Sequence, residues 1–222
     1  MTGYDAVLFD LDGTLVDTEK GIVRAFLHTF RAMGRPMEEA DIRRYLGPPL
    51  RNSFSEHFQG ELVERAVEEY RAFYERYGLE GVAPFAGVPR MLEKLHRAGF
   101  VLAVATSKAL PAARKVLDHF DLTQWFDVVG GASLDNTLDT KTAVMRYVLA
   151  QPALRGRHAV MAGDRANDME GAADCGLDAV GAAYGYAAPG ELEAFSPVFL
   201  AKSAQELGAW LLANQAEKEN VR

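Results

Sequence analysis

The chain has 222 residues, of which 49% are hydrophobic and 10% aromatic, so there is enough apolar material for a packed interior and disorder is not expected. The formal net charge of −7 argues against a nucleic-acid polymer as a partner, because such a partner requires a basic surface. No apolar run approaches the roughly 18 residues that can span a membrane. We therefore expect a soluble, cytoplasmic protein. Its single cysteine, Cys175, has no partner for an internal disulfide, and we interpret it as a small buried apolar residue rather than a nucleophile.

The first predicted element is a buried strand at residues 6–9, and two carboxylates, Asp10 and Asp12, stand where it ends. Side chains alternate along an extended chain, so both acids point the same way if the extended conformation continues through Leu11. Two carboxylates so close repel one another unless a cation or a proton lies between them. Gly13 allows the backbone to leave the strand sharply. The sequence therefore predicts a paired-acid site at the carboxyl end of a strand.

The next segment, residues 17–85, is predicted to be an all-helical insertion without a strand. Apolar residues recur at helical spacing in four stretches, which are residues 18–33, 38–46, 50–58 and 61–77. The last stretch carries an apolar and aromatic stripe on one face and is followed by Gly78. We interpret this stripe as the core of a helical bundle, with a ligand-binding surface as the alternative.

From residue 86 onward, predicted strands and helices alternate. The expected helices are residues 89–98, 110–120, 140–150, 167–175 and 204–214, and the expected strands are residues 100–106, 127–130, 159–162, 179–183 and 198–201. Apolar strands separated by helices of about ten residues indicate a parallel sheet that is covered on both faces. Residues 1–16 and 86–222 are therefore predicted to form an α/β core with a Rossmann-like, doubly wound parallel sheet. In such sheets, ligands bind outside the carboxyl ends of the strands.

Polar side chains follow three of the predicted strands and should meet at that edge: Asp10, Asp12, Thr106, Ser107, Lys108, Asp164 and Asp168. Four carboxylates at one edge would repel one another at neutral pH, so a divalent cation is the economical explanation. Oxygen ligands without histidine or cysteine favour a hard ion, and we expect Mg²⁺.

Lys141 stands in the first turn of the helix expected at residues 140–150, where the helix macrodipole disfavours a cation by about 0.3–1 kcal/mol. An anion at the sheet edge would explain this placement, bound by Lys141 together with the hydroxyls and backbone amides of Thr106 and Ser107. Taken singly, Lys141 could be a solvated lysine, Thr106 a strand residue and Asp164 a helix cap. Their joint occurrence at one edge is more specific, and it indicates a phosphoryl-transfer site.

These residues carry a resemblance to the haloacid dehalogenase superfamily. Asp10-Leu11-Asp12-Gly13-Thr14 resembles its first signature, Thr106 its second, Lys141 its third, and Gly163-Asp164 with Asp168 its fourth. A helical insertion directly after the first signature resembles the cap domain of the phosphoglycolate-phosphatase-like branch. The segments at residues 46–50, 133–137 and 163–165 are similar to a bacterial group described as phosphoglycolate-phosphatase-like or 5′-nucleotidase-like.

The resemblance implies a magnesium-dependent phosphatase that acts through an aspartyl-phosphate. Asp10 would be the nucleophile, and Asp12 would move the protons as general acid and base. Mg²⁺ would be held by Asp10, the backbone carbonyl of Asp12, and Asp164, with Asp168 just outside the ligand shell. The same resemblance assigns the phosphoryl oxygens to Thr106, Ser107 and Lys141.

Specificity is expected to come from the cap, whose loop at residues 47–51 would lie over the site. There Arg51 would meet a second anionic group of the substrate, or else it is a surface arginine. The expected partner is a small phosphorylated metabolite, phosphoglycolate or a nucleoside 5′-monophosphate. A sugar phosphomutase can share every core residue and is the nearest alternative. A dehalogenase has no use for the metal-binding acids, and a phosphoacceptor signalling module of the same sheet type lacks a cap.

Overall fold

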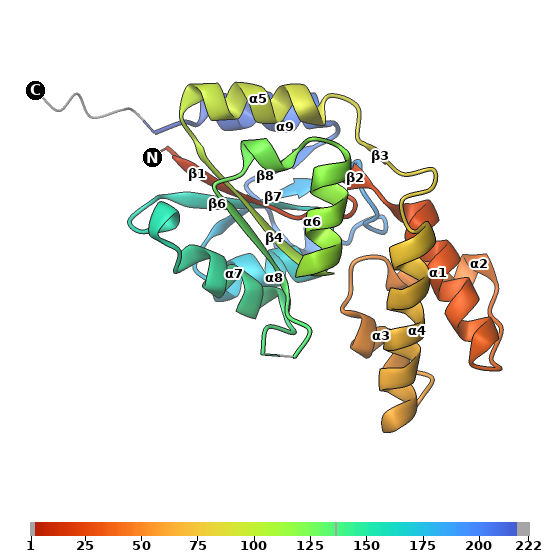
Figure 1. Ribbon diagram of the computed structural model, residues 1–222. Helices are drawn as coiled ribbons and strands as arrows, with labels where there is room; N and C mark the ends of the chain where they lie inside the picture. Colours follow the sequence, from red (N-terminus) through yellow and green to blue (C-terminus); the bar gives the residue numbers. More distant parts are fainter. Residues whose placement is uncertain (1–2, 136, 217–222) are drawn as a thin grey trace, which may run out of the picture.

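A six-stranded parallel sheet forms the centre of the molecule in the computed structural model, which describes residues 3–135 and 137–216 (Figure 1). The strands lie in the order β5-β4-β1-β6-β7-β8, and each pairs in parallel with its neighbours. Their bounds are β1 (Ala6–Phe9), β4 (Val101–Ala109), β5 (Val128–Ala132), β6 (Ala159–Gly163), β7 (Asp178–Ala182) and β8 (Phe199–Ala201). The predicted α/β class with a Rossmann-like parallel sheet is confirmed.

Helices cover both faces of this sheet, because successive residues of its buried strands point to opposite sides. In β1, Val7 and Phe9 pack in one apolar cluster, and Ala6 and Leu8 pack in another. The first cluster includes α5 (Val88–Ala98), α6 (Leu110–His119) and α9 (Ala204–Ala213), and the second includes α7 (Lys141–Leu149) and α8 (Ala166–Asp174). The sheet is thus the middle of three layers.

Four helices between β1 and α5 form a separate bundle beside the sheet (Figure 1). They are α1 (Glu19–Ala32), α2 (Glu39–Ile42), α3 (Leu50–Ser55) and α4 (Glu61–Tyr77). Their apolar faces share one cluster in which the Phe26 ring lies 5.2 Å from that of Phe54 and 4.9 Å from that of Tyr70. The aromatic stripe on α4 therefore contributes to a bundle core. The division into residues 1–16 with 86–222 and an inserted cap at 17–85 stays a prediction.

Two short strands connect the bundle to the sheet, and they differ from the prediction that residues 17–85 contain no strand. β2 (Val16–Asp17) pairs antiparallel with β3 (Ala83–Pro84). Strands of two residues are too short to show a period-two pattern, which is why the sequence did not reveal them. They hold the entry and exit of the bundle side by side.

The other predicted elements agree with the structure to within a few residues, with two differences in extent. The helix expected at residues 38–46 is α2 followed by a 3₁₀ turn, Arg43–Tyr45. Strand β4 continues to Ala109, beyond the predicted end at residue 106, with irregular pairing between Thr106 and Ala109. Further 3₁₀ turns lie at Thr123–Trp125, Pro152–Leu154 and Glu193–Phe195. Asn136, inside the segment 133–137, lies outside the described residues.

Within residues 3–135 and 137–216, none of the helices combines the length and the apolar character needed to cross a bilayer.

Candidate active site

The central position of β1 brings together side chains that are distant in sequence. β1 pairs with β4 on one side and β6 on the other, and Phe9 lies opposite both Val104 and Ala162. Chain connections diverge to the two sides of β1, which makes this point a topological switch where ligands bind in open α/β sheets. Asp10, Thr106 and Asp164, at the carboxyl ends of these three strands, are therefore neighbours, as the sequence predicted.

The loop after β1 folds tightly against Asp164. Gly13 has a φ of 83°, in the left-handed region that favours glycine. A Cβ at this position would lie 2.1 Å from Asp164 Oδ2, so a side chain cannot be accommodated without displacing that carboxylate. The next residue, Thr14, donates its hydroxyl to Asp164 Oδ1 at 2.8 Å. The loop that carries the two acids thus also orients the acid that follows β6.

Lys141 lies buried between two carboxylates. Its Nζ is 2.9 Å from Asp10 Oδ1 and 2.7 Å from Asp168 Oδ1, and it donates to the backbone carbonyl of Ala105 at 3.1 Å. Helix α7 begins at Lys141 because the Thr140 hydroxyl accepts from Ala143 N at 3.1 Å. Burial alone would lower the pKa of Lys141, but Asp10 and Asp168 raise it above its ordinary value. Lys141, which the macrodipole disfavours in the first turn of α7, therefore has two carboxylate partners.

Asp164 and Asp168 are both fully buried and are held by backbone amides. Asp164 Oδ2 accepts from Tyr186 N at 2.9 Å. Asp168 Oδ2 accepts from Arg165 N at 3.0 Å and so completes a capping box at the start of α8. Since its other oxygen faces Lys141, Asp168 orients that lysine.

The side chains at this edge carry a net negative charge that a divalent cation would balance. Asp10, Asp164 and Asp168 each place one carboxylate oxygen within 4.8 Å of the others, and all three residues are buried. Lys141 offsets one of the three negative charges, so two remain. Burial raises the pKa of Asp10 to about 6, with Lys141 opposing the shift, and burial raises the pKa of Asp164 well above its ordinary value. A cation beside these oxygens would relieve that cost, and their chemistry suits Mg²⁺.

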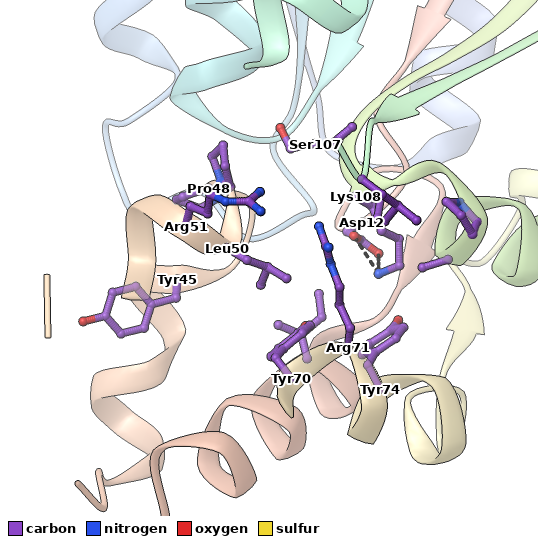
Figure 2. Close-up of a pocket in the computed structure, with 18 of the residues that line it drawn as sticks. Asp12, Tyr45, Pro48, Leu50, Arg51, Tyr70, Arg71, Tyr74, Ser107 and Lys108 are labelled. Atoms are coloured by element: carbon purple, nitrogen blue, oxygen red, sulfur yellow. Dashed lines mark hydrogen bonds and ion pairs between the residues drawn. The ribbon is translucent and has the colours of Figure 1, made fainter. Parts of the chain in front are cut away.

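Asp12 has a different environment from the other three acids. Lys108 Nζ lies 3.1 and 3.0 Å from its two carboxylate oxygens, and the Thr18 hydroxyl donates to Oδ1 at 2.7 Å. The Lys108 Nζ also lies 4.2 Å from the centre of the Tyr74 ring on α4 (Figure 2). Burial would lower the pKa of Lys108, but Asp12 raises it. The four acids thus meet at one edge with different partners: Asp10 and Asp168 share Lys141, Asp12 pairs with Lys108, and Asp164 is held by Thr14 and Tyr186 N.

Lys108 was expected at this edge from the sequence, but no role was assigned to it. Its position directly after Thr106 and Ser107, at the end of a strand that leads to the site, was the available signal. Thr106 is buried, and its Oγ1 accepts from Lys108 N at 3.2 Å. Ser107 Oγ accepts from the Asn167 side chain at 3.4 Å. Both predicted phosphate-binding hydroxyls therefore lie at the expected edge.

A cavity of about 410 Å³ lies between the sheet and the helical bundle (Figure 2). Asp12, Ser107 and Lys108 line it from the sheet side, and the residues from the bundle include Phe26, Tyr45, Pro48, Leu50, Arg51, Tyr70, Arg71 and Tyr74. The loop after Leu46 approaches the core closely, since a Cβ on Gly47 would lie 2.8 Å from Arg165 Cγ. Arg51 donates through Nε and Nη2 to Glu64, at 2.8 and 2.6 Å. Its charge is therefore already paired within the bundle.

The site matches the pattern that the sequence predicted for phosphoryl transfer. It has an acid directly after the central strand, a second acid two residues later, and a buried lysine at a neighbouring helix start. The chain belongs to the haloacid dehalogenase-like hydrolase family, whose sequence profile matches residues 7–182. The predicted family resemblance is confirmed.

Comparisons with individual proteins agree with this family. A solved structure described as a predicted phosphatase from Clostridium acetobutylicum superimposes with a TM-score of 0.90 at 33% identity, covering 96% of this chain and 100% of that one. The chain is 36% identical to a 5′-nucleotidase from Pseudomonas aeruginosa, over 87% of this chain and 89% of the relative. It is 42% identical to a tyrosine-protein kinase, PtkA, from Mycobacterium tuberculosis, over 81% of this chain, and this match spans only 62% of that relative.

Proposed function

We propose that the protein is a magnesium-dependent phosphatase that hydrolyses small phosphomonoesters through a phosphorylated Asp10. The observation that carries the proposal is the position of Asp10, which is buried at the end of the central strand, beside Lys141 and within the acidic cluster. A carboxylate needs no deprotonation at neutral pH to act as a nucleophile once a cation offsets its burial. The family match and the phosphatase and nucleotidase names of relatives support this activity.

In the first step, an Asp10 carboxylate oxygen attacks the phosphorus of the monoester. The bond from phosphorus to the alcohol oxygen breaks, and Asp12 gives its proton to that leaving oxygen. Lys141, Thr106 and Ser107 hold the phosphoryl oxygens and offset the charge that develops on them. Lys108 and the Thr18 hydroxyl keep the Asp12 carboxyl group in place.

In the second step, Asp12 takes a proton from a water molecule as its oxygen attacks the phosphorus of the phosphorylated Asp10. The bond between phosphorus and the Asp10 oxygen breaks, inorganic phosphate leaves, and the Asp10 carboxylate is restored. Mg²⁺ would be held by Asp10, the backbone carbonyl of Asp12, and Asp164, and when bound it neutralises charge on the nucleophile and on the phosphoryl oxygens. Asp168 would act beside this shell by holding Lys141.

Residues 17–85 act in this proposal as a cap domain that closes over the site. The paired strands β2 and β3 are the two chain crossings between bundle and sheet and therefore the expected hinge. Closure of the cap domain excludes bulk water from the site until Asp10 has been phosphorylated. The expected substrates are small phosphorylated metabolites of the phosphoglycolate or nucleoside 5′-monophosphate type, and the expected location is the cytoplasm. The name of the P. aeruginosa relative supports the nucleotide class.

The test is a phosphate-release screen of the purified protein with Mg²⁺ over a panel of phosphorylated metabolites, with Asp10→Asn as the matched variant. We expect release of inorganic phosphate by the wild type and its loss, by at least a factor of about 10³, in Asp10→Asn. The exposed Asp118→Asn is the control and should leave the rate unchanged. An isomerised sugar phosphate without free phosphate would identify a phosphomutase instead. The proposal fails if no monoester releases phosphate, or if Asp10→Asn keeps the wild-type rate.

A further inference from the structure

Arg71, on α4, directs its side chain into the cavity between bundle and sheet. Figure 2 shows its guanidinium group reaching from the helix toward the side where Asp12 and Ser107 lie, with the guanidinium group of Arg51 turned toward it. Arg71 was not among the residues that the sequence singled out. One turn of helix separates it from Tyr74, which contacts Lys108.

Arg71 and Arg51 differ in their partners. Arg51 is committed to Glu64 through two hydrogen bonds of 2.8 and 2.6 Å. The Arg71 Nε is buried and has no hydrogen-bond partner within residues 3–135 and 137–216. Burial lowers the pKa of Arg71, the Arg51 charge lowers it further, and Glu64 and Glu68 oppose both effects. Two guanidinium groups therefore lie close together where only one has a bidentate carboxylate partner.

The cavity lining around the Arg71 side chain combines apolar and aromatic residues with a few charged ones. The lining from the bundle includes the apolar and aromatic side chains of Phe26, Leu50 and Tyr70. The lining also contains the carboxylates of Glu75 and Asp139, and Asp12, which is paired with Lys108. In surroundings of low polarity an unsatisfied charged donor is costly, and an anion bound to it is held more strongly than in water. A volume of about 410 Å³ is within the range of about 300–1,000 Å³ typical of small-molecule sites.

We propose that Arg71 binds a second anionic group of the substrate, a carboxylate or a phosphate, while the phosphoryl group that is transferred meets Asp10. The substrate would then be a phosphomonoester whose two anionic ends are separated by an organic body that fits the apolar lining. This inference rests on the proposed function. A planar guanidinium matches a carboxylate or phosphate with two parallel hydrogen bonds, which adds selectivity for such a group. Arg51, by contrast, is held by its hydrogen bonds to Glu64 and lines the same cavity.

The test uses two substrates that differ by one carboxylate para to the phosphate, phenyl phosphate and 4-carboxyphenyl phosphate, with Mg²⁺ present. In the wild type, kcat/KM for the carboxylated substrate should exceed that for phenyl phosphate by at least about tenfold, as expected for a charge-assisted bidentate hydrogen bond. In Arg71→Gln the ratio should fall close to one, and Arg71→Lys should keep an intermediate ratio. The control is Arg76→Gln, an exposed arginine in the last turn of the same helix, which should keep the wild-type ratio.

A binding measurement keeps the proposal testable when a variant or a substrate gives no turnover. Calorimetric titration compares benzylphosphonate with 4-carboxybenzylphosphonate, and wild type with Arg71→Gln, after thermal unfolding has shown that the variant is folded. Tighter binding of the carboxylated compound that disappears in Arg71→Gln supports the subsite even if no monoester is hydrolysed, in which case only the proposed function fails. Turnover and binding without any preference for the carboxylated compounds overturn the subsite alone. A preference that survives in Arg71→Gln but is lost in Arg51→Gln overturns the assignment to Arg71.

Discussion

Replacement of Lys141 should have a large, measurable effect on stability. Its Nζ contacts Asp10 and Asp168 within 3 Å, and its side chain is only 3% exposed. Replacement by glutamine leaves two buried carboxylates without their cation. Removing one partner of a buried ion pair costs about 3–5 kcal/mol, so we expect the metal-free protein to lose about that much free energy of unfolding at pH 7.5. For a chain of this size, that corresponds to about 6–20 °C in Tm.

The assay is equilibrium unfolding in urea with EDTA present, comparing wild type, Lys141→Gln and the double variant Lys141→Gln/Asp168→Asn. The double variant removes one of the stranded charges, so it should be more stable than Lys141→Gln alone. Arg97→Gln, which breaks an exposed pair with Glu93, is the control and should cost less than about 1 kcal/mol. A loss below about 1 kcal/mol in Lys141→Gln, or no recovery in the double variant, would refute the reasoning.

Three further outcomes are expected. Mg²⁺ should raise Tm at pH 7.5 but much less at pH 5. The pKa of Asp10 is raised from 3.8 to about 6 in the folded protein, so the metal-free protein gains stability as the pH falls through 6, while the protonated acid loses affinity for the cation. An increase in Tm that is equal at both pH values contradicts this. Gly13→Ala should reduce phosphate release at least about tenfold in a folded protein, because the added Cβ meets the Asp164 carboxylate. The control is Gly34→Ala, because Gly34 also has a positive φ but open space around it, and equal activity of the two variants refutes the steric argument. Phe54→Ala should cost about 3–5 kcal/mol in urea unfolding, since its ring is fully buried among the aromatics of the bundle, whereas Tyr77→Ala on the exposed side of α4 should cost much less.

Much of the fold follows from local pattern. The apolar run at residues 6–9 and the alternating strands and helices after residue 86 indicated the parallel sheet, because strands buried on both faces are uniformly apolar. The short strands β2 and β3 escaped prediction, since two residues carry no periodicity. The extension of β4 through Lys108 was also missed, because polar residues at a strand end resemble a loop.

The main residues of the candidate site could be grouped from the sequence for a topological reason. The carboxyl ends of parallel strands lie along one edge, so Asp10, Thr106 and Asp164 could be assigned to that edge once the sheet was inferred. That they are neighbours depends on the strand order β4-β1-β6, which the structure shows. Lys141 could be added because the helix macrodipole disfavours a cation at a helix start, and a nearby anion would explain its placement. The contacts of Lys141 with both Asp10 and Asp168 depend on how α7 and α8 pack on the sheet, and no local pattern specifies that.

By itself, then, the amino-acid sequence determined the sheet, the edge where chemistry is expected and the family, since these depend on periodicity and on short motifs. Only the tertiary structure decided that Asp12 pairs with Lys108 and that Arg51 pairs with Glu64. It also decided that Arg71 faces the cavity with an Nε that has no hydrogen-bond partner among the described residues. The physical reason is that these partners are set by tertiary packing: the pairing of β1 with β4 brings Asp12 to Lys108, and the packing of α3 on α4 brings Arg51 to Glu64. Asp12 and Lys108 are 96 residues apart in the chain, and such a separation in sequence carries no signal of contact.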